Sequence, residues 1–199
     1  ATALKALVDL YDKTGRTEDY LRTMERLGQV APEGEKLATL RNGTRDGSLV
    51  IGSGNRILSV DVDGNHRALL AEIPMPTHNR TNDGTVDAQG RLWFGTMDDA
   101  EAADTGKIYR FAHGRLADSG LPPVSITNGP AFCADGSTMY HTDTPTQFIH
   151  AYDYDAATGT PSNPRVFARF AVERDRPDGA AVDRDGCYWT AFYTGGNVL

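Results

Sequence analysis

From residue 41 onward, short apolar segments rich in β-branched and aromatic residues alternate with glycine-containing turns. Four copies of a turn followed by such a segment occur at residues 46–51, 90–94, 136–140 and 186–189. Their turn glycines are 43, 46 and 50 residues apart. A second β-rich segment follows each copy, at residues 56–60, 107–111, 148–152 and 197–199. A period of about forty to fifty residues made of short antiparallel strands is typical of β-propeller blades. We therefore predict an all-β fold with about four propeller blades.

The first forty residues show a helical pattern instead. Apolar residues at positions 3, 4, 7, 8 and 11 fall on one helical face, and Gly15 then interrupts the pattern. Thr17 opens a second amphipathic segment that ends before Pro32. The layout resembles one hairpin of a tetratricopeptide repeat. We predict a helical hairpin over residues 1–40 and a partial propeller over residues 41–199. The hairpin serves either as a peptide-binding or oligomerising module or as a packing cap.

The composition narrows the choice of partner. The formal net charge of −7 argues against a nucleic-acid binder, because such a protein must neutralise a run of phosphates. No apolar run approaches the roughly 20 residues of a membrane helix, and the first residues lack the charged-then-apolar layout of a signal peptide. We therefore expect a cytoplasmic protein that acts on a small molecule, with neither nucleic acid nor membrane as partner. Cys133 and Cys187 are predicted to be buried apolar residues, with a disulfide as the alternative.

Three polar residues recur at one position of the repeat. Counting eight residues back from Gly90, Gly136 and Gly186 gives Asn82, Asn128 and Asp178. Equivalent positions on the innermost strands of a propeller converge on its axis, so we expect these three side-chain oxygens to point at one small volume. Oxygen ligands suit a hard divalent cation such as Ca²⁺ or Mg²⁺, with Mn²⁺ or Zn²⁺ as alternatives. The alternative interpretation is that Asn and Asp beside glycine only form turns.

Three stretches of the sequence resemble the motifs of one known family. They are residues 79–84 with 90–97, residues 126–132 with 134–136, and residues 177–183 with 185–189. In these stretches residues 41–199 resemble the senescence marker protein 30, gluconolactonase and regucalcin family. The resemblance implies a six-bladed propeller that hydrolyses sugar lactones with one divalent cation on its axis. It also implies that Asn128 and Asp178 are metal ligands and that Arg80 and Asn82 bind the substrate.

The chain departs from the family pattern in two places. The family's first blade supplies a metal-binding glutamate from a Leu-Gly-Glu-Gly-Pro strand. Here the predicted hairpin takes that place, and Glu33 and Glu35 sit in no matching motif. The family also continues for about two further blades, so we expect an incomplete six-bladed-type propeller whose open strand edges favour self-association.

Two functions follow from this pattern. The first is a metal-dependent lactonase, a carboxylic-ester hydrolase, in which the cation polarises the lactone carbonyl and Asp178 is a ligand or the general base. The loss of the first-blade glutamate and of the last blades would impair it. The second is a non-catalytic propeller fragment that acts as a binding or assembly module. Asp83 and Asp143 are predicted to make turn or inter-strand hydrogen bonds, and His141 is predicted to be an ordinary strand residue.

Overall fold

The computed structural model describes residues 37–38, 49–61, 67–171, 176–195 and 198–199. The predicted helical hairpin, with Glu33 and Glu35, lies outside these residues except for its last part. There, Leu37–Ala38 forms the short strand β1, in a stretch that the sequence pattern assigns to the hairpin. The division at residue 40 stays a prediction. The described part of the chain contains no helix long and apolar enough to cross a membrane.

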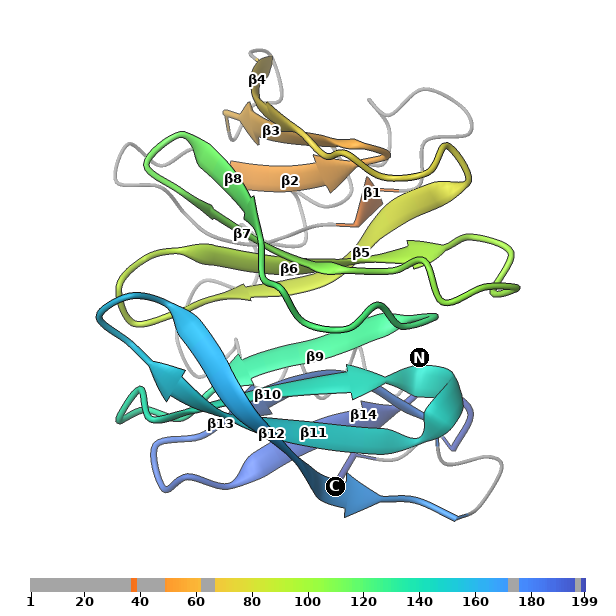
Figure 1. Cartoon of the computed structure of the whole chain (residues 1–199), viewed down its shortest axis with the longest axis vertical. Coiled ribbons are helices and arrows are strands. Elements are labelled where there is room, and N and C mark those ends of the chain that lie inside the picture. Colours follow the sequence, from red (N-terminus) through yellow and green to blue (C-terminus); the bar gives the residue numbers. More distant parts are fainter. Residues whose placement is uncertain (1–36, 39–48, 62–66, 172–175, 196–197) are drawn as a thin grey trace.

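Fourteen described strands form four antiparallel sheets; the first three follow one another from top to bottom of Figure 1, and the fourth overlaps the third in that view. The first sheet contains β1, β2 (Leu49–Ser53), β3 (Arg56–Val60) and β4 (Arg67–Glu72). The second contains β5 (Asn79–Val86), β6 (Leu92–Asp98), β7 (Ile108–Ala112) and β8 (Arg115–Asp118). The third contains β9 (Thr127–Phe132), β10 (Thr138–Asp143), β11 (Phe148–Asp155) and β12 (Thr160–Arg169). The fourth contains β13 (Pro177–Val182) and β14 (Tyr188–Phe192).

The strands lie where the glycine turns predict them. Gly90, Gly136 and Gly186 have positive φ angles of 78°, 71° and 83°, which a residue without Cβ adopts at little cost. Each of these turns joins the first strand of its sheet to the second. The predicted second segments are confirmed as β3, β7 and β11, while residues 198–199 contribute only an isolated bridge from Val198 to Ala191.

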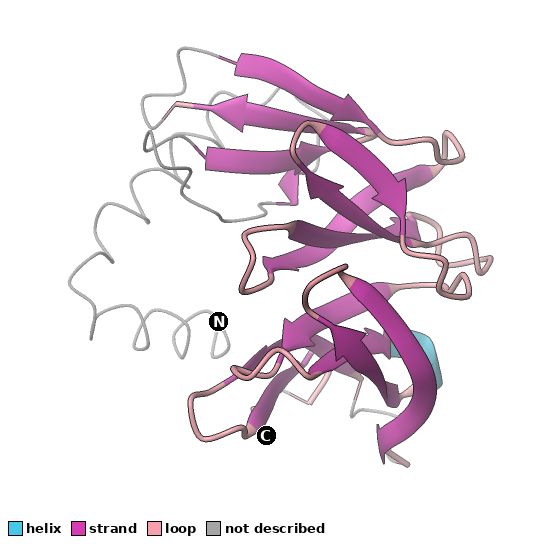
Figure 2. Ribbon diagram, turned by 60° about the vertical axis from the view of Figure 1, so that its left-hand side comes forward, coloured by secondary structure: helices cyan, strands magenta, loops and turns pink. Residues whose placement is uncertain are grey.

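The apolar core lies between successive sheets, which face one another in Figure 2. Val50 and Ile57 of the first sheet pack with Phe94 and Tyr109 of the second. The next interface holds Trp93 and Ile108 against Met139, Tyr152 and Tyr154. Because the second sheet has a neighbouring sheet on each face, the strand β6 is buried along its whole length. The stacking leaves the first strands β5, β9 and β13 beside one another.

The prediction that both cysteines are buried is wrong for Cys187. Cys133 is partly buried and its Sγ lies 3.6 Å from the Tyr140 hydroxyl, but Cys187 is exposed. Both are free thiols, so the alternative of a disulfide is also wrong. Cys187 lies in the turn of the fourth sheet, whose outer side no described sheet covers, and this is why an apolar residue type there stays in solvent.

Candidate functional site

The three neighbouring inner strands carry the same irregularity. In each, two residues stand opposite one residue of the next strand, which is a β-bulge. Residues 82–83 stand opposite Gly95, residues 129–130 opposite His141, and residues 178–179 opposite Ala191. Bulges redirect side chains and are common beside active sites. Asn82 and Asp178 lie within their bulges and Asn128 directly precedes its own, so the predicted axial residues sit at the bulges.

Glycine allows these strands to approach closely. A Cβ at Gly95 would lie 1.8 Å from Oγ1 of Thr127, so a larger residue in β6 would push β9 away. Gly129 has a φ of 55°, and a Cβ there would lie 2.9 Å from the Ala180 Cβ and 3.0 Å from the Tyr188 hydroxyl. The contacts between β5, β9 and β13 therefore depend on glycine at the bulge of β9 and opposite the bulge of β5.

Asn82 and Asn128 meet across the second and third sheets. Nδ2 of Asn82 donates to Oδ1 of Asn128 at 3.0 Å and to the Thr127 carbonyl at 2.8 Å. Nδ2 of Asn128 in turn donates to Oγ1 of Thr144 at 2.8 Å. That hydroxyl donates to the Pro177 carbonyl at 2.7 Å, directly before Asp178. One chain of hydrogen bonds thus joins the three predicted axial positions.

The sequence pattern did not indicate a role for Thr144. It opens a short 3-10 helix, Thr144–Thr146, that follows β10, and it is buried. Its hydroxyl accepts from one side of the site and donates to the other, so it fixes the amide plane of Asn128. A threonine has no fixed place in the repeat, and only the fold brings it between β9 and β13. The Pro that follows it is a weak signal for the turn.

Asp83 joins the same group of residues. Its Oδ2 accepts the Gly129 N–H at 2.9 Å and its Oδ1 accepts the Gly84 N–H at 2.8 Å, which confirms the predicted inter-strand hydrogen bond. Dense packing around the carboxylate, only partly offset by these bonds and reinforced by the charge of Asp178, raises the pKa of Asp83 to about 6. Burial likewise raises the pKa of Asp178, against a lowering effect of the Gly179 N–H.

Arg80 lies at the edge of this group, two residues before the bulge of β5. Its Nε pairs with the Asp99 carboxylate at 2.8 Å, and its Nη1 donates to Oδ1 of Asn82 at 2.9 Å and to the Thr81 carbonyl at 3.0 Å. These bonds fix the guanidinium plane, while a quarter of the side chain stays exposed. The two residues that the resemblance assigns to substrate binding are therefore in direct contact.

The donor chemistry of the group fits a hard divalent cation. The side chains of Asn128, Asp178 and Asp83 bring oxygen atoms from three adjacent strands, and both carboxylates have raised pKa values because negative charge is poorly solvated there. A cation would relieve that cost. Among the described residues, no three His, Cys, Asp or Glu side chains form a metal-holding cluster, so a cation here would also need an amide oxygen such as Oδ1 of Asn128, which accepts the Asn82 Nδ2–H in this structure.

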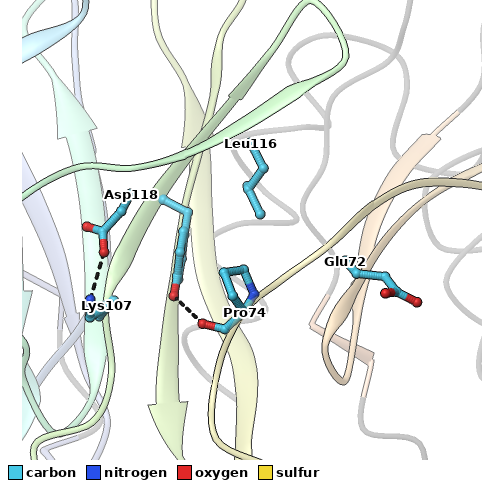
Figure 3. Close-up of a pocket in the computed structure, with 6 residues that line it drawn as sticks. Glu72, Pro74, Lys107, Leu116 and Asp118 are labelled. Atoms are coloured by element: carbon cyan, nitrogen blue, oxygen red, sulfur yellow. Dashed lines mark hydrogen bonds and ion pairs between the residues drawn. The ribbon is translucent and has the colours of Figure 1, made fainter.

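A separate groove of about 490 Å³ opens on the outer side of the second sheet (Figure 3). It is lined by Glu72, Pro74, Lys107, Tyr109, Leu116 and Asp118. Lys107 Nζ pairs with Asp118 at 2.7 Å, and the Tyr109 hydroxyl donates to the Pro74 carbonyl at 3.0 Å. These polar groups bond to one another, and none of the bulge residues reaches the groove. We therefore place the candidate site at the bulges.

Comparison with known proteins assigns the chain to a protein family. The family model described as SMP-30/Gluconolactonase/LRE-like region matches residues 6–199, so the chain belongs to this family. The structure also resembles a Dos1 propeller with a TM-score of 0.52 at 11% identity, covering 78% of this chain and 41% of that one. That likeness supports a β-propeller fold.

Two particular relatives are closer in sequence. The chain is 36% identical to the 6-deoxy-6-sulfogluconolactonase of Pseudomonas putida over 185 residues, which are 87% of this chain and 63% of the relative. It is 30% identical to a calcium-binding protein, regucalcin, from Agrobacterium tumefaciens, with a TM-score of 0.72, covering 81% of this chain and 54% of that one. The chain thus spans about half to two thirds of the length of these relatives.

Proposed function

We propose that the bulge residues form a site that hydrolyses a sugar lactone with the help of one divalent cation. The observation that carries the proposal is the hydrogen-bonded chain from Asn82 through Asn128 and Thr144 to the strand of Asp178, with Arg80 at its edge. It occurs in a family whose relatives include a named gluconolactonase, and this favours an enzyme over a non-catalytic assembly module.

Asn128 and Asp178 would hold the cation. When bound, it would supply Lewis-acid polarisation of the lactone carbonyl. We propose that the cation is Ca²⁺, Mg²⁺, Mn²⁺ or Zn²⁺. Ca²⁺ should be tested first, because one relative is a calcium-binding protein. The raised pKa values of the two carboxylates support the same placement, because a site that penalises uncompensated negative charge gains most from a cation.

Asp178 would act as the general base. A water molecule adds to the lactone carbonyl carbon as one of its protons passes to the Asp178 carboxylate. The ring C–O bond then breaks, and the protonated Asp178 returns that proton to the departing ring oxygen, which becomes the free hydroxyl of the opened sugar acid. Burial raises the pKa of Asp178 in the metal-free chain, and a base works best when its pKa lies near the working pH, although a cation on the same carboxylate would offset this rise.

Arg80 and Asn82 would orient the sugar. The guanidinium is held by Asp99 and Asn82, so it presents a fixed set of N–H donors to hydroxyl or anionic groups of the substrate. The contribution is one of positioning, because a fixed partner lowers the entropy cost of reaching the transition state. We propose aldonolactones as the substrate class, in line with the Pseudomonas relative's name.

The test is lactone opening followed by acid release in a pH-stat. Purified protein with Ca²⁺ is expected to open glucono-δ-lactone faster than buffer, to stop in excess chelator and to recover when Ca²⁺, Mn²⁺ or Zn²⁺ is added. Asp178→Ala should abolish turnover. Asp183→Ala is the matched control, because Asp183 lies in the same sheet but in an exposed turn away from the bulges. Normal turnover in folded Asp178→Ala would overturn the assignment.

A further inference from the structure

We propose that Asp83 is a positioning residue of this site: its carboxylate joins the bulges of β5, β9 and β13 and sets the charge around Asn128 and Asp178. The consequence for cation binding rests on the proposed function, whereas the positioning role stands on the contacts of the metal-free chain. The sequence pattern gives Asp83 only a hydrogen-bonding role, and the resemblance gives it none.

The first contact links two sheets. Asp83 belongs to β5 in the second sheet, and its Oδ2 accepts the N–H of Gly129 in the third sheet at 2.9 Å. Gly129 directly follows Asn128 and has a left-handed backbone with φ of 55°. The carboxylate therefore satisfies a backbone donor that the bulge removes from the β9–β10 ladder. Because Gly129 is held there, the neighbouring Asn128 is held as well.

The second contact reaches the fourth sheet. A Cβ at Gly179 would lie 3.6 Å from Oδ2 of Asp83, so the glycine brings the backbone of β13 against this carboxylate. Asp178 is the preceding residue, and the two carboxylates lie close enough for their charges to interact. Asp83 thus bonds the backbone next to Asn128 and lies beside the glycine that follows Asp178, while reaching both from a third strand.

Two aspartates that bond only local backbone N–H groups show how Asp83 differs from a turn residue. Asp135 and Asp155 accept N–H groups only two or three residues further along the chain, in exposed turns. Such bonds stabilise a local turn. The Gly129 bond instead spans 46 residues and lies at the point where three strands meet. A turn role does not explain a carboxylate in this position, where its charge is repelled by Asp178.

A negative charge beside a cation site strengthens binding even without direct ligation. Groups that surround and orient metal ligands typically change metal affinity by 10- to 100-fold when they are mutated. We therefore expect Asp83 to affect cation affinity through its charge and the geometry of β9 through its oxygen atoms. These two effects can be separated, because asparagine keeps one acceptor oxygen for Gly129 and lacks the charge.

The experiment compares Asp83→Asn, Asp83→Ala and the control Asp143→Asn in the full chain. Asp143 is also buried, and it accepts an inter-strand N–H from Ile126 at 3.2 Å, so it controls for the loss of any buried carboxylate. Hydrogen exchange measured by NMR reports the protection of the Gly129 amide in metal-free protein. Calorimetric titration with Ca²⁺, and separately with Mn²⁺, reports affinity without reference to turnover.

In Asp83→Asn we expect Gly129 protection to persist while cation affinity falls about 10- to 100-fold. In Asp83→Ala we expect the Gly129 amide to exchange at least about tenfold faster, with an equal or greater loss of affinity. Asp143→Asn should keep both properties. Unchanged Gly129 exchange in Asp83→Ala, or an equal affinity loss in Asp143→Asn, would overturn the inference. If wild-type protein binds neither cation, the proposed function fails, and Gly129 exchange still decides the positioning role.

Discussion

Asp83 and Asp87 lie four residues apart, and the surroundings of their carboxylates are opposite. Asp87 is 5% exposed and accepts Arg91 Nε at 2.6 Å, Trp93 Nε1 at 3.1 Å and the Tyr154 hydroxyl. Burial raises its pKa, but the bonds from Tyr154 and Arg91 outweigh this and lower it. Asp83 has backbone donors and faces a second carboxylate, and its pKa is raised to about 6. Both carboxylates thus join the second and third sheets, but Asp87 is paired with the cation of Arg91, whereas Asp83 has no cationic partner among its hydrogen bonds and favours a bound cation.

One hydrogen bond of Asp87, the bond from the indole N–H of the tryptophan six residues later, recurs in the fourth sheet. Asp183 accepts Trp189 Nε1 at 2.8 Å, as Asp87 accepts that of Trp93. Trp189 is nevertheless 49% exposed, while Trp93 is 1% exposed beneath Tyr154 and Phe132 of the third sheet. The turn and its Asp to Trp bond are therefore local properties, whereas burial comes from the next sheet.

Asp87→Ala should have the largest effect on stability. It removes the only carboxylate that Arg91 contacts in the described structure; Arg91 is 9% exposed, and a buried cation left without its carboxylate costs about 3–5 kcal/mol. Urea unfolding should show this as a lower midpoint. Asp183→Ala removes the equivalent exposed carboxylate and should move the midpoint far less. Equal shifts in the two variants would mean that the contact between sheets adds little to the local turn.

His141 offers a second test of how burial affects a titratable group, in this case an imidazole. It stands opposite the bulge of β9 and is 2% exposed, and its Nε2 has no hydrogen-bond partner in the described part of the structure. Burial, with a smaller contribution from His150, lowers its pKa to about 3. The unfolded chain titrates near 6.5, so the stability contribution is complete above that pH and is lost as the pH falls toward 3.

The loss should approach about 1.4 kcal/mol per pH unit between these values. Urea unfolding at pH 7 and pH 5 measures the slope, and His141→Gln should flatten it. His150→Gln, on the opposite strand β11, should keep the wild-type slope. An unchanged slope in His141→Gln would show that His141 charges freely in the folded protein.

Asp83→Asn should have the smallest effect on stability and the opposite sign to Asp87→Ala. A raised carboxyl pKa means that stability is complete below the unfolded value near 3.8 and is lost as the pH rises through about 6. At pH 7 without metal, the neutral amide should therefore remove this penalty and stabilise the fold, by an amount reduced because it offers one acceptor oxygen where the carboxylate offers two. Thermal melts at pH 7 and pH 4 test this, since the gain should disappear at pH 4. A variant that is less stable at both values would contradict it.

Local sequence patterns predict much of the fold. Neighbouring residues alone determine the glycine turns at 90, 136 and 186 and the strands after them. Asn82 and Asn128 each lie eight residues before a turn glycine, and this equal distance predicts that they lie beside one another, as they do. The roles of Asp83 and Thr144 could not be predicted in the same way, because they depend on bulges and on contacts between sheets. The exposure of Cys187 was missed for a related reason, since it depends on what covers the fourth sheet.

The central claim is that Asn128 and Asp178 bind one divalent cation at the bulges of the inner strands. Anomalous diffraction from crystals soaked in Mn²⁺ tests it most directly. We predict one anomalous peak within about 2.6 Å of both the Asn128 Oδ1 and an Asp178 carboxylate oxygen, and its loss in Asp178→Ala. The absence of a peak between these side chains, or a peak that persists in the variant, would contradict the account.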